Sequence, residues 1–253
     1  MRAEFERDGC VIVRGVVAPD EVAAMTDVFL ALIPEVAYPP GADGRVIREI
    51  PGAANAYPPL AQIARDPRFG ALMAEALGAA RVQLLQDTLL YKPAIHGGVV
   101  EWHQDYTYLG YLVPAHAATL RIALLPEDVE NGCMRVVDGS HRWGPLGDNQ
   151  AFRATSVDSL IPSLSPEQRD QIENARALVL GPGDVSIHSC LTLHGSVANP
   201  SPRPRRTIIL RMFDAECRLD RARLPPGAET YFPTDADGHL DASAFPYVYG
   251  SAP

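Results

Sequence analysis

The residues best suited to binding a metal ion lie in one short segment, Glu101-Trp102-His103-Gln104-Asp105. Successive side chains of a strand point to opposite faces, so His103 and Asp105, which are two residues apart, project to the same side. Two histidines and one carboxylate form the facial triad of non-haem iron(II) oxygenases, which leaves adjacent coordination positions open. A His-x-Asp pair alone is common by chance. The prediction of a metal site therefore requires a second histidine from elsewhere in the chain.

That second histidine is expected in a segment with the pattern of a hairpin. Leu193-His194-Gly195-Ser196 is followed by Arg203-Pro204-Arg205-Arg206. With a turn centred near Asn199-Pro200, residues 194 and 205 would lie opposite each other on antiparallel strands and share a face. The planar guanidinium of an arginine can bind a carboxylate through two parallel hydrogen bonds. The pattern makes His194 a candidate metal ligand and Arg205 a candidate partner for a ligand's carboxylate.

The elements that position these residues are expected to be mainly β. From about Arg81 the chain consists of short runs rich in Val, Ile, Leu and Thr that are separated by turn residues. The expected strands are 81–92, 99–105, 117–125, 132–137, 184–190 and 206–214. Before them, one amphipathic helix opens at Asp20-Glu21, and another follows Asp66-Pro67 and ends at Gly78. Residues 141–175 interrupt the strands with a polar loop and a short helix that starts near Ser165, as a lid would.

The composition indicates a soluble globular protein. Its 253 residues suit a single domain with a sizeable core, and its 47% hydrophobic and 21% charged content is ordinary. No run approaches the roughly 18 apolar residues of a membrane span, and the polar N-terminus lacks the apolar segment of a secretory signal, so we expect a cytoplasmic location. The net charge of −9 and the shortness of the basic run 203–206 disfavour nucleic acid as a partner. The scattered cysteines are expected as buried free thiols.

Four ordered segments resemble the phytanoyl-CoA dioxygenase family, a branch of the iron(II)/2-oxoglutarate oxygenases. They are FERDGCVIVRG (5–15), WHQD (102–105), NGCMRVVDGSH (131–141) and HGS (194–196), with Arg205 downstream. The resemblance spans most of the sequence and implies a double-stranded β-helix, that is, a jelly-roll or cupin-like barrel with supporting N-terminal α-helices. In such a single domain of residues 1–253, helical support would occupy about 1–80, the barrel core about 81–214 and a C-terminal tail 215–253.

The resemblance also implies an activity and its site residues. Carried over by position, His103, Asp105 and His194 would hold iron(II), and Arg205 would bind the distal carboxylate of 2-oxoglutarate. The implied reaction uses O2 and 2-oxoglutarate, releases succinate and CO2, and hydroxylates a small molecule such as a secondary metabolite or a small acid. Halogenating relatives replace the carboxylate ligand with a small residue, so Asp105 favours hydroxylation.

Further residues are weaker candidates for the site. Gln86 and Lys92 match family positions that line the active site. Arg121 stands where an aromatic residue is frequent in the family, and a charged group inside a barrel needs a partner, so an anionic ligand is a reasonable hypothesis. Candidate substrate contacts are the tyrosines that follow the metal motif: Tyr106, Tyr108 and Tyr111. His188, six residues before His194, is expected as a hydrogen-bonded structural histidine.

Several alternatives remain open at this point. The same iron centre could direct desaturation, epoxidation or demethylation instead of hydroxylation. A barrel that binds a metal and a small ligand as a sensor, without turnover, is a rival of a different class. A zinc hydrolase would leave the carboxylate-binding role of Arg205 without a purpose. The sequence does not decide the substrate or the oligomeric state.

Overall fold

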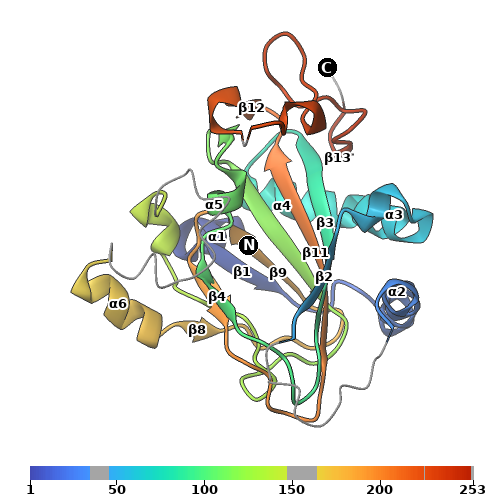
Figure 1. Cartoon of the computed structure of the whole chain (residues 1–253), viewed down its shortest axis with the longest axis vertical. Coiled ribbons are helices and arrows are strands. Elements are labelled where there is room, and N and C mark those ends of the chain that lie inside the picture. The colour runs from blue at the N-terminus through green and yellow to red at the C-terminus, as the bar shows by residue number, and fades with distance from the viewer. Residues whose placement is uncertain (35–45, 147–163, 225, 252–253) are drawn as a thin grey trace.

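The computed structural model describes residues 1–34, 46–146, 164–224 and 226–251, and in them most strands belong to two sheets (Figure 1). The major sheet has seven strands, and its path runs β1 (Cys10–Val13), β9 (Val185–Ser189), β6 (Ala117–Ala123), β11 (Arg205–Asp214), β3 (Val82–Lys92) and β13 (Tyr247–Tyr249), with β2 (Arg48–Pro51) also paired to β3. The minor sheet runs β4 (Val100–His103), β10 (His194–Ser196), β7 (Arg135–Val136) and β8 (Arg176–Ala177). A separate pair joins β12 (Arg218–Leu219) to β5 (Leu112–Val113).

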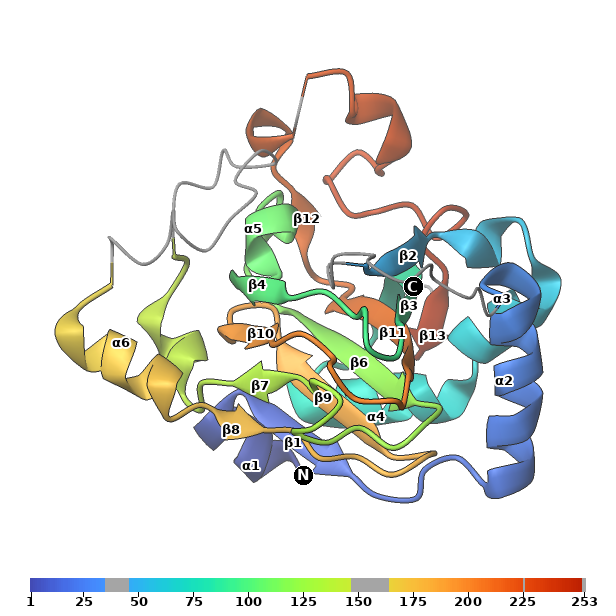
Figure 2. The ribbon, with the colours of Figure 1, turned by 60° about the horizontal axis from the view of Figure 1, so that its bottom comes forward.

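The minor sheet lies over one face of the major sheet, as Figure 2 shows. This is the expected jelly-roll arrangement, and the six strands predicted from about residue 81 onward are all present. Within the described residues, however, the strands form separate facing sheets rather than one closed barrel. The space between the facing sheets is therefore where side chains from distant parts of the chain meet.

Helices cover the opposite face of the major sheet. They include α1 (Arg2–Asp8), α2 (Pro19–Leu32), α3 (Pro58–Ala64) and α4 (Pro67–Leu77). The predicted ends of α4 are confirmed: Asp66 caps its start by accepting a hydrogen bond from the backbone N–H of Arg68, and Gly78 ends it with a φ of 68°. A positive φ of this kind strains most L-residues but not glycine.

The period of two along each strand of the major sheet separates apolar from polar side chains. On β11, Ile208, Leu210 and Met212 join the main hydrophobic core with Phe29 of α2 and Phe69 of α4. The alternate residues of β11, β3, β6 and β9 face the minor sheet instead. They include most of the buried polar side chains of these four strands: Thr88, Lys92, Thr119, Arg121, Ser186, His188, Arg205 and Thr207.

The segments predicted as insertion and tail have different outcomes. The helix expected near Ser165 is present as α6 (Pro166–Glu173), whereas residues 147–163 of the predicted insertion lie outside the described residues. The C-terminal tail is more than an appendage, because β13 pairs with β3 at the edge of the major sheet and β12 pairs with β5. The other short helices of the described residues are α5 (Tyr106–Leu109), η1 (Ala53–Asn55), η2 (Ser140–Trp143), η5 (Arg221–Arg223) and η6 (Glu229–Tyr231).

Two expectations about the whole chain can be compared with the structure. All four cysteines are buried free thiols, as predicted. In the described part of the chain, no helix has both the length and the apolar character needed to cross a membrane. The expected cytoplasmic location stays a prediction.

Candidate metal centre

Three predicted ligands come together between the sheets. His103 ends β4 and pairs in register with His194 of β10, so the two imidazoles are neighbours, with ring centroids 4.2 Å apart. Asp105 follows β4 and directs Oδ1 to both rings, at 3.8 Å from His103 Nε2 and 4.0 Å from His194 Nε2. One ligand atom from each of the three residues lies within 4.8 Å of the other two. This is the spacing at which three side chains can hold one metal ion.

Backbone carbonyls set the tautomers of both histidines. Nδ1 of His103 lies 2.7 Å from the carbonyl oxygen of Glu101, and Nδ1 of His194 lies 2.9 Å from that of Thr192. A carbonyl can only accept a hydrogen bond, so each Nδ1 carries the proton and each Nε2 keeps its lone pair for a metal. Burial, together with the neighbouring His103, holds the pKa of His194 well below its ordinary value. The neutral, ligating form of His194 is therefore favoured.

The carboxylate of Asp105 is held from its other side by the major sheet. Thr119 Oγ1 donates a hydrogen bond of 2.6 Å to Oδ2, and His188 Nε2 lies 3.2 Å from the same oxygen. Asp105 is only 2% exposed. Burial opposes its ionisation, but the His188 hydrogen bond and the electrostatic interactions with His194 and Arg211 keep its pKa well below the ordinary value. Oδ2 is thus occupied, and Oδ1 remains directed at the two histidines.

The expected hairpin between residues 194 and 205 is wrong. His194 pairs with His103 and Val136 in the minor sheet, whereas Arg205 pairs with Lys92 in the major sheet. The segment between them, which includes three prolines, carries the chain from one sheet to the other. Arg205 still points between the sheets and is buried, so the two residues share the interior without being cross-strand partners.

A second group of buried charges lies farther along the major sheet. Glu127, which is fully buried, accepts hydrogen bonds from Arg121 (2.9 Å) and from Thr207 (2.6 Å), and its Oε2 lies 3.7 Å from Nε of Arg205. Although burial raises the pKa of Glu127, the charges of Arg121 and Arg205 lower it overall. Arg121 therefore has an internal partner, which the anionic-ligand hypothesis did not include.

Lys92 joins this group from β3. Its Nζ donates to Ser196 Oγ at 2.8 Å and to the carbonyl oxygen of Val197 at 2.6 Å. Burial, reinforced by the charge of Arg205, lowers the pKa of Lys92 to about 6. Arg205 donates a short hydrogen bond to the carbonyl oxygen of Gly132, while its buried Nε has no hydrogen-bond partner among the described residues. A buried N–H without a partner is costly unless a ligand accepts from it.

The other sequence candidates are distributed unevenly around the site. Gln86 is exposed and accepts a weak hydrogen bond from Arg211 (3.4 Å). Tyr108 has its ring edge-to-face against His103 at 5.9 Å and is 42% exposed. Tyr106 and Tyr111 are instead buried in a hydrophobic cluster with Leu112, away from solvent. Of the three tyrosines, Tyr108 is the one placed to touch a molecule bound at the metal centre.

Several residues beside the predicted site residues were missed by sequence reasoning. Thr119, Glu127 and Arg211 all contact a site residue but carry no motif of their own. Strand parity alone places Thr119 on the face of Arg121, and Arg211 on the face of Arg205. That signal was available in the sequence, but it does not reveal which buried group each would meet.

The donor set fits a divalent iron ion. Two imidazole nitrogens with free lone pairs and one carboxylate oxygen, all directed at a common point, are the ligands of the facial triad. The buried Nε of Arg205 without a hydrogen-bond partner fits a ligand carboxylate, as 2-oxoglutarate would supply. The observed residues are therefore compatible with both groups.

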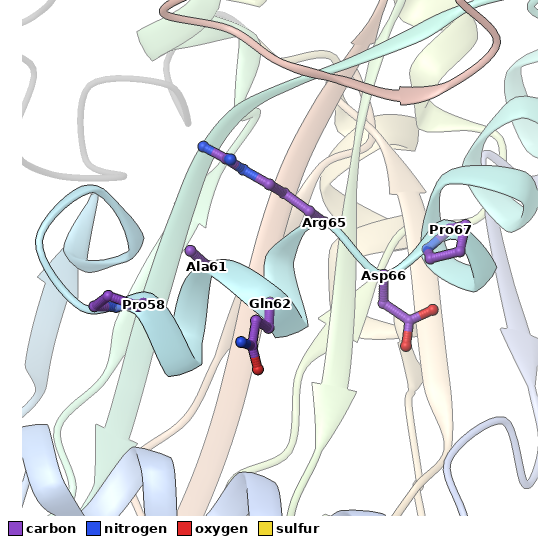
Figure 3. Close-up of a pocket in the computed structure, with 6 residues that line it drawn as sticks. All are labelled: Pro58, Ala61, Gln62, Arg65, Asp66 and Pro67. Atoms are coloured by element: carbon purple, nitrogen blue, oxygen red, sulfur yellow. The ribbon is translucent and has the colours of Figure 1, made fainter.

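Two other surface features lie outside this centre. The pocket in Figure 3 is lined by residues at the junction of α3 and α4, on the helical side of the major sheet: Pro58, Ala61, Gln62, Arg65, Asp66 and Pro67. Its acid, Asp66, is already engaged by Arg68. Asp235, Asp237 and His239 also bring potential ligand atoms together, but on an exposed loop.

Comparison with known proteins supports the family resemblance over most of the chain. The family model described as phytanoyl-CoA dioxygenase (PhyH) matches residues 5–207. The ectoine dioxygenase of Sphingopyxis alaskensis is 28% identical over 242 residues, which cover 87% of this chain and 76% of that protein. The phytanoyl-CoA dioxygenase of Arabidopsis thaliana is 30% identical over 166 residues, covering 60% of this chain and 54% of the plant protein.

Solved structures share the fold. The α-ketoglutarate-dependent epimerase SnoN from nogalamycin biosynthesis superposes with a TM-score of 0.77 at 24% identity, covering 98% of this chain and 97% of SnoN. EctD from S. alaskensis, in its apoform, gives a TM-score of 0.69 at 24% identity, covering 87% of this chain and 78% of EctD. At this level of identity the likeness establishes the jelly-roll fold.

Thr119→Val is expected to weaken divalent metal binding by about 10- to 100-fold, because outer partners that orient a ligating carboxylate typically contribute that much. Isothermal titration of the apoprotein with Co(II) measures the effect. Thr26→Val on α2, remote from the site, is the matched control and should bind as wild type does. Equal Co(II) affinity in Thr119→Val and wild type would show that Asp105 does not depend on this hydrogen bond.

Glu127→Gln is expected to lower the free energy of unfolding by about 3–5 kcal/mol, because removing one partner of a buried ion pair leaves the other charge uncompensated. Replacing both partners, in Arg121→Met with Glu127→Met, should cost less than the single change. Urea unfolding gives both values. The control is Glu130→Gln, which removes an exposed ion pair with Arg203. It should lower the free energy of unfolding by only about 0–1 kcal/mol. A double variant as unstable as Glu127→Gln would contradict the ion-pair explanation.

Proposed function

Because the chain belongs to the phytanoyl-CoA dioxygenase family, we propose that it is an iron(II)- and 2-oxoglutarate-dependent dioxygenase that hydroxylates a small molecule. The observation that carries this proposal is the convergence of His103, Asp105 and His194 in the space between the sheets that also contains Arg205. A metal site alone would suit many proteins. A metal site combined with a buried arginine that still has an N–H to donate suits one that also binds a carboxylate.

The three ligands are assigned to iron(II) by their donor atoms. Nε2 of His103, Nε2 of His194 and Oδ1 of Asp105 would hold the ion, and the Nδ1 and Oδ2 contacts keep these atoms in place. When bound, iron(II) and 2-oxoglutarate supply the oxidising chemistry, in which O2 is consumed and succinate and CO2 are released. The protein supplies orientation, and its buried walls exclude water.

Arg205 is the proposed partner for the distal carboxylate of 2-oxoglutarate. Its guanidinium is held by the carbonyl oxygen of Gly132 and by the charge of Glu127. These two contacts fix the position of the guanidinium before a ligand binds. Lys92 and Ser196, hydrogen-bonded to each other beside it, are the proposed neighbours of the same carboxylate. Because the pKa of Lys92 is about 6, an arriving anion would also favour its protonated form. In this proposal Arg121 does not bind the co-substrate itself. It pairs with Glu127, which in turn holds Arg205.

The outcome of the reaction has an alternative that the fold allows. SnoN is described as an epimerase, and SnoK, which superposes with a TM-score of 0.72, as a carbocyclase. The same jelly roll thus serves more than one outcome, so the fold does not determine it. Hydroxylation is favoured here because curated relatives that cover much of the chain, among them the ectoine dioxygenase of S. alaskensis, are named dioxygenases. Mass spectrometry of the product separates hydroxylation from these two outcomes, since hydroxylation adds an oxygen atom, whereas epimerisation and ring closure do not.

Anaerobic titration with iron(II) and 2-oxoglutarate is expected to produce the weak visible charge-transfer band of a bidentate 2-oxo acid on iron(II). His194→Ala should abolish the band, because it removes one of three ligands. His239→Ala, which changes a partly exposed histidine outside this centre, is the control and should keep the band. A wild-type protein with neither the band nor saturable 2-oxoglutarate binding would make a metal or ligand sensor the better account.

Arg205→Gln is expected to weaken 2-oxoglutarate binding by about 10- to 100-fold, because a charge-assisted pair with the distal carboxylate is lost. Pyruvate lacks that carboxylate, so its weaker binding should be unchanged. Anaerobic titration of the visible band with each 2-oxo acid measures both affinities. The control is Arg206→Gln, the next residue, whose side chain lies on the opposite face near Tyr91. An equal loss for both acids would refute the assignment of Arg205 to the distal carboxylate.

A further inference from the structure

Arg211 is a cation beside the metal centre that the proposed reaction does not use. It lies on β11 opposite Gln86 of β3 and Thr119 of β6. Its Nε is 3.9 Å from Oδ1 of Asp105, the carboxylate oxygen that faces the two histidines. The side chain is 22% exposed, so solvent and small molecules reach it.

Arg211 and Arg205 lie at different positions along the same strand, β11. They share a face of β11, but six residues separate them, which is roughly 20 Å along an extended strand. Arg211 is level with Thr119 and His188, the two residues that hold Asp105. Arg205 is near the far end of the interior, with Lys92 and Glu127. The two arginines are therefore too far apart to bind the same carboxylate.

The hydrogen bonds of Arg211 leave part of its guanidinium available. Nη1 donates to Thr88 Oγ1 at 2.9 Å and weakly to Gln86. Within the described part of the chain, Nε and Nη2 make no hydrogen bond, and the 3.9 Å approach to Asp105 is longer than one. Once Oδ1 serves a metal dication, Asp105 compensates Arg211 less. A partly buried cation in that position is stabilised by a further anion.

The surroundings of Arg211 indicate what such an anion would belong to. Tyr108 presents an exposed aromatic ring beside His103, and Gln86 adds a neutral amide. Glu49 lies on the edge strand β2, opposite Leu90, four residues along β3 from Gln86. A single guanidinium with an aromatic neighbour suits one negative charge on a compact organic molecule. The acid on β2 disfavours a molecule with several negative charges.

We propose that Arg211 binds a carboxylate of the substrate and thereby selects small organic monoacids as the substrate class. This inference rests on the proposed function, because it places the substrate next to the iron site. The guanidinium fork would hold the carboxylate from Nε and Nη2, and Tyr108 would cover the carbon framework beside His103.

The test measures binding of matched carboxylates and amides to the anaerobic complex with iron(II) and 2-oxoglutarate. The probes are cyclohexanecarboxylate and L-proline, each compared with its primary amide, so that shape is kept and the charge is removed. Calorimetry gives each dissociation constant, and a shift of the visible band reports binding next to the metal. The proteins are wild type, Arg211→Gln, Arg211→Lys and the control Arg81→Gln. Arg81 is similarly exposed (26%) but pairs with Glu216, away from the site.

In wild type and Arg81→Gln, at least one carboxylate is expected to bind about tenfold more tightly than its amide. The ratio should fall to about one in Arg211→Gln and be intermediate in Arg211→Lys, which keeps the charge but loses the fork. Equal binding of acids and amides in wild type, or no binding of any carboxylate, overturns the proposal. It is also overturned if Arg211→Gln loses the iron and 2-oxoglutarate band itself, because Arg211 would then only position Asp105. A wild-type protein without that band overturns the proposed function and this inference with it.

Discussion

The structure depends on how one buried carboxylate is compensated. Asp105 is almost completely removed from water, and an ionised carboxylate in that position is unfavourable unless opposite charges and hydrogen-bond donors surround it. Those donors come from the major sheet, through Thr119 and His188, while the imidazoles that face its free oxygen come from the minor sheet. The two sheets must therefore pack in one register for the carboxylate to be satisfied. The same register leaves three ligand atoms directed at one point, so the packing of the fold and the geometry of the centre are a single requirement.

The interior beyond the metal centre carries an excess of positive charge. Lys92, Arg121 and Arg205 surround one acid, Glu127, in a space closed to water. Such a cluster is unfavourable by itself, and the lowered pKa of Lys92 shows how the protein responds. A dicarboxylate co-substrate would supply the missing negative charge. The stability of the empty protein and its affinity for the co-substrate are thus expected to be linked through the same residues.

In the proposed assignments, Arg205 and Arg211 would serve two separate anion-binding regions of the interior, one farther along β11 and one beside Asp105. Both lie on the inward face of β11, because six residues are an even number and preserve strand parity. Arg205 is buried and held by Glu127, which suits a co-substrate that is the same in every turnover. Arg211 is partly exposed beside Tyr108, which suits a substrate that must enter from solvent. Such an arrangement would separate binding of the co-substrate from the choice of substrate.

The sequence by itself determined the local features. The motif predicted that His103 and Asp105 converge, although Asp105 lies beyond the end of β4, at the start of α5, and not on the strand itself. Turn and capping residues located α4 and α6, and the order of motifs identified the family fold. The sequence did not determine how the strands pair. It predicts His194 and Arg205, eleven residues apart, on one hairpin, but the two residues belong to different sheets. The partners of Arg121 and Arg211, and the contribution of β13 to the major sheet, were likewise decided by the tertiary structure. The physical reason is that alternation along a strand is a property of neighbouring residues, whereas the compensation of a buried charge depends on groups that only folding brings within a few ångströms.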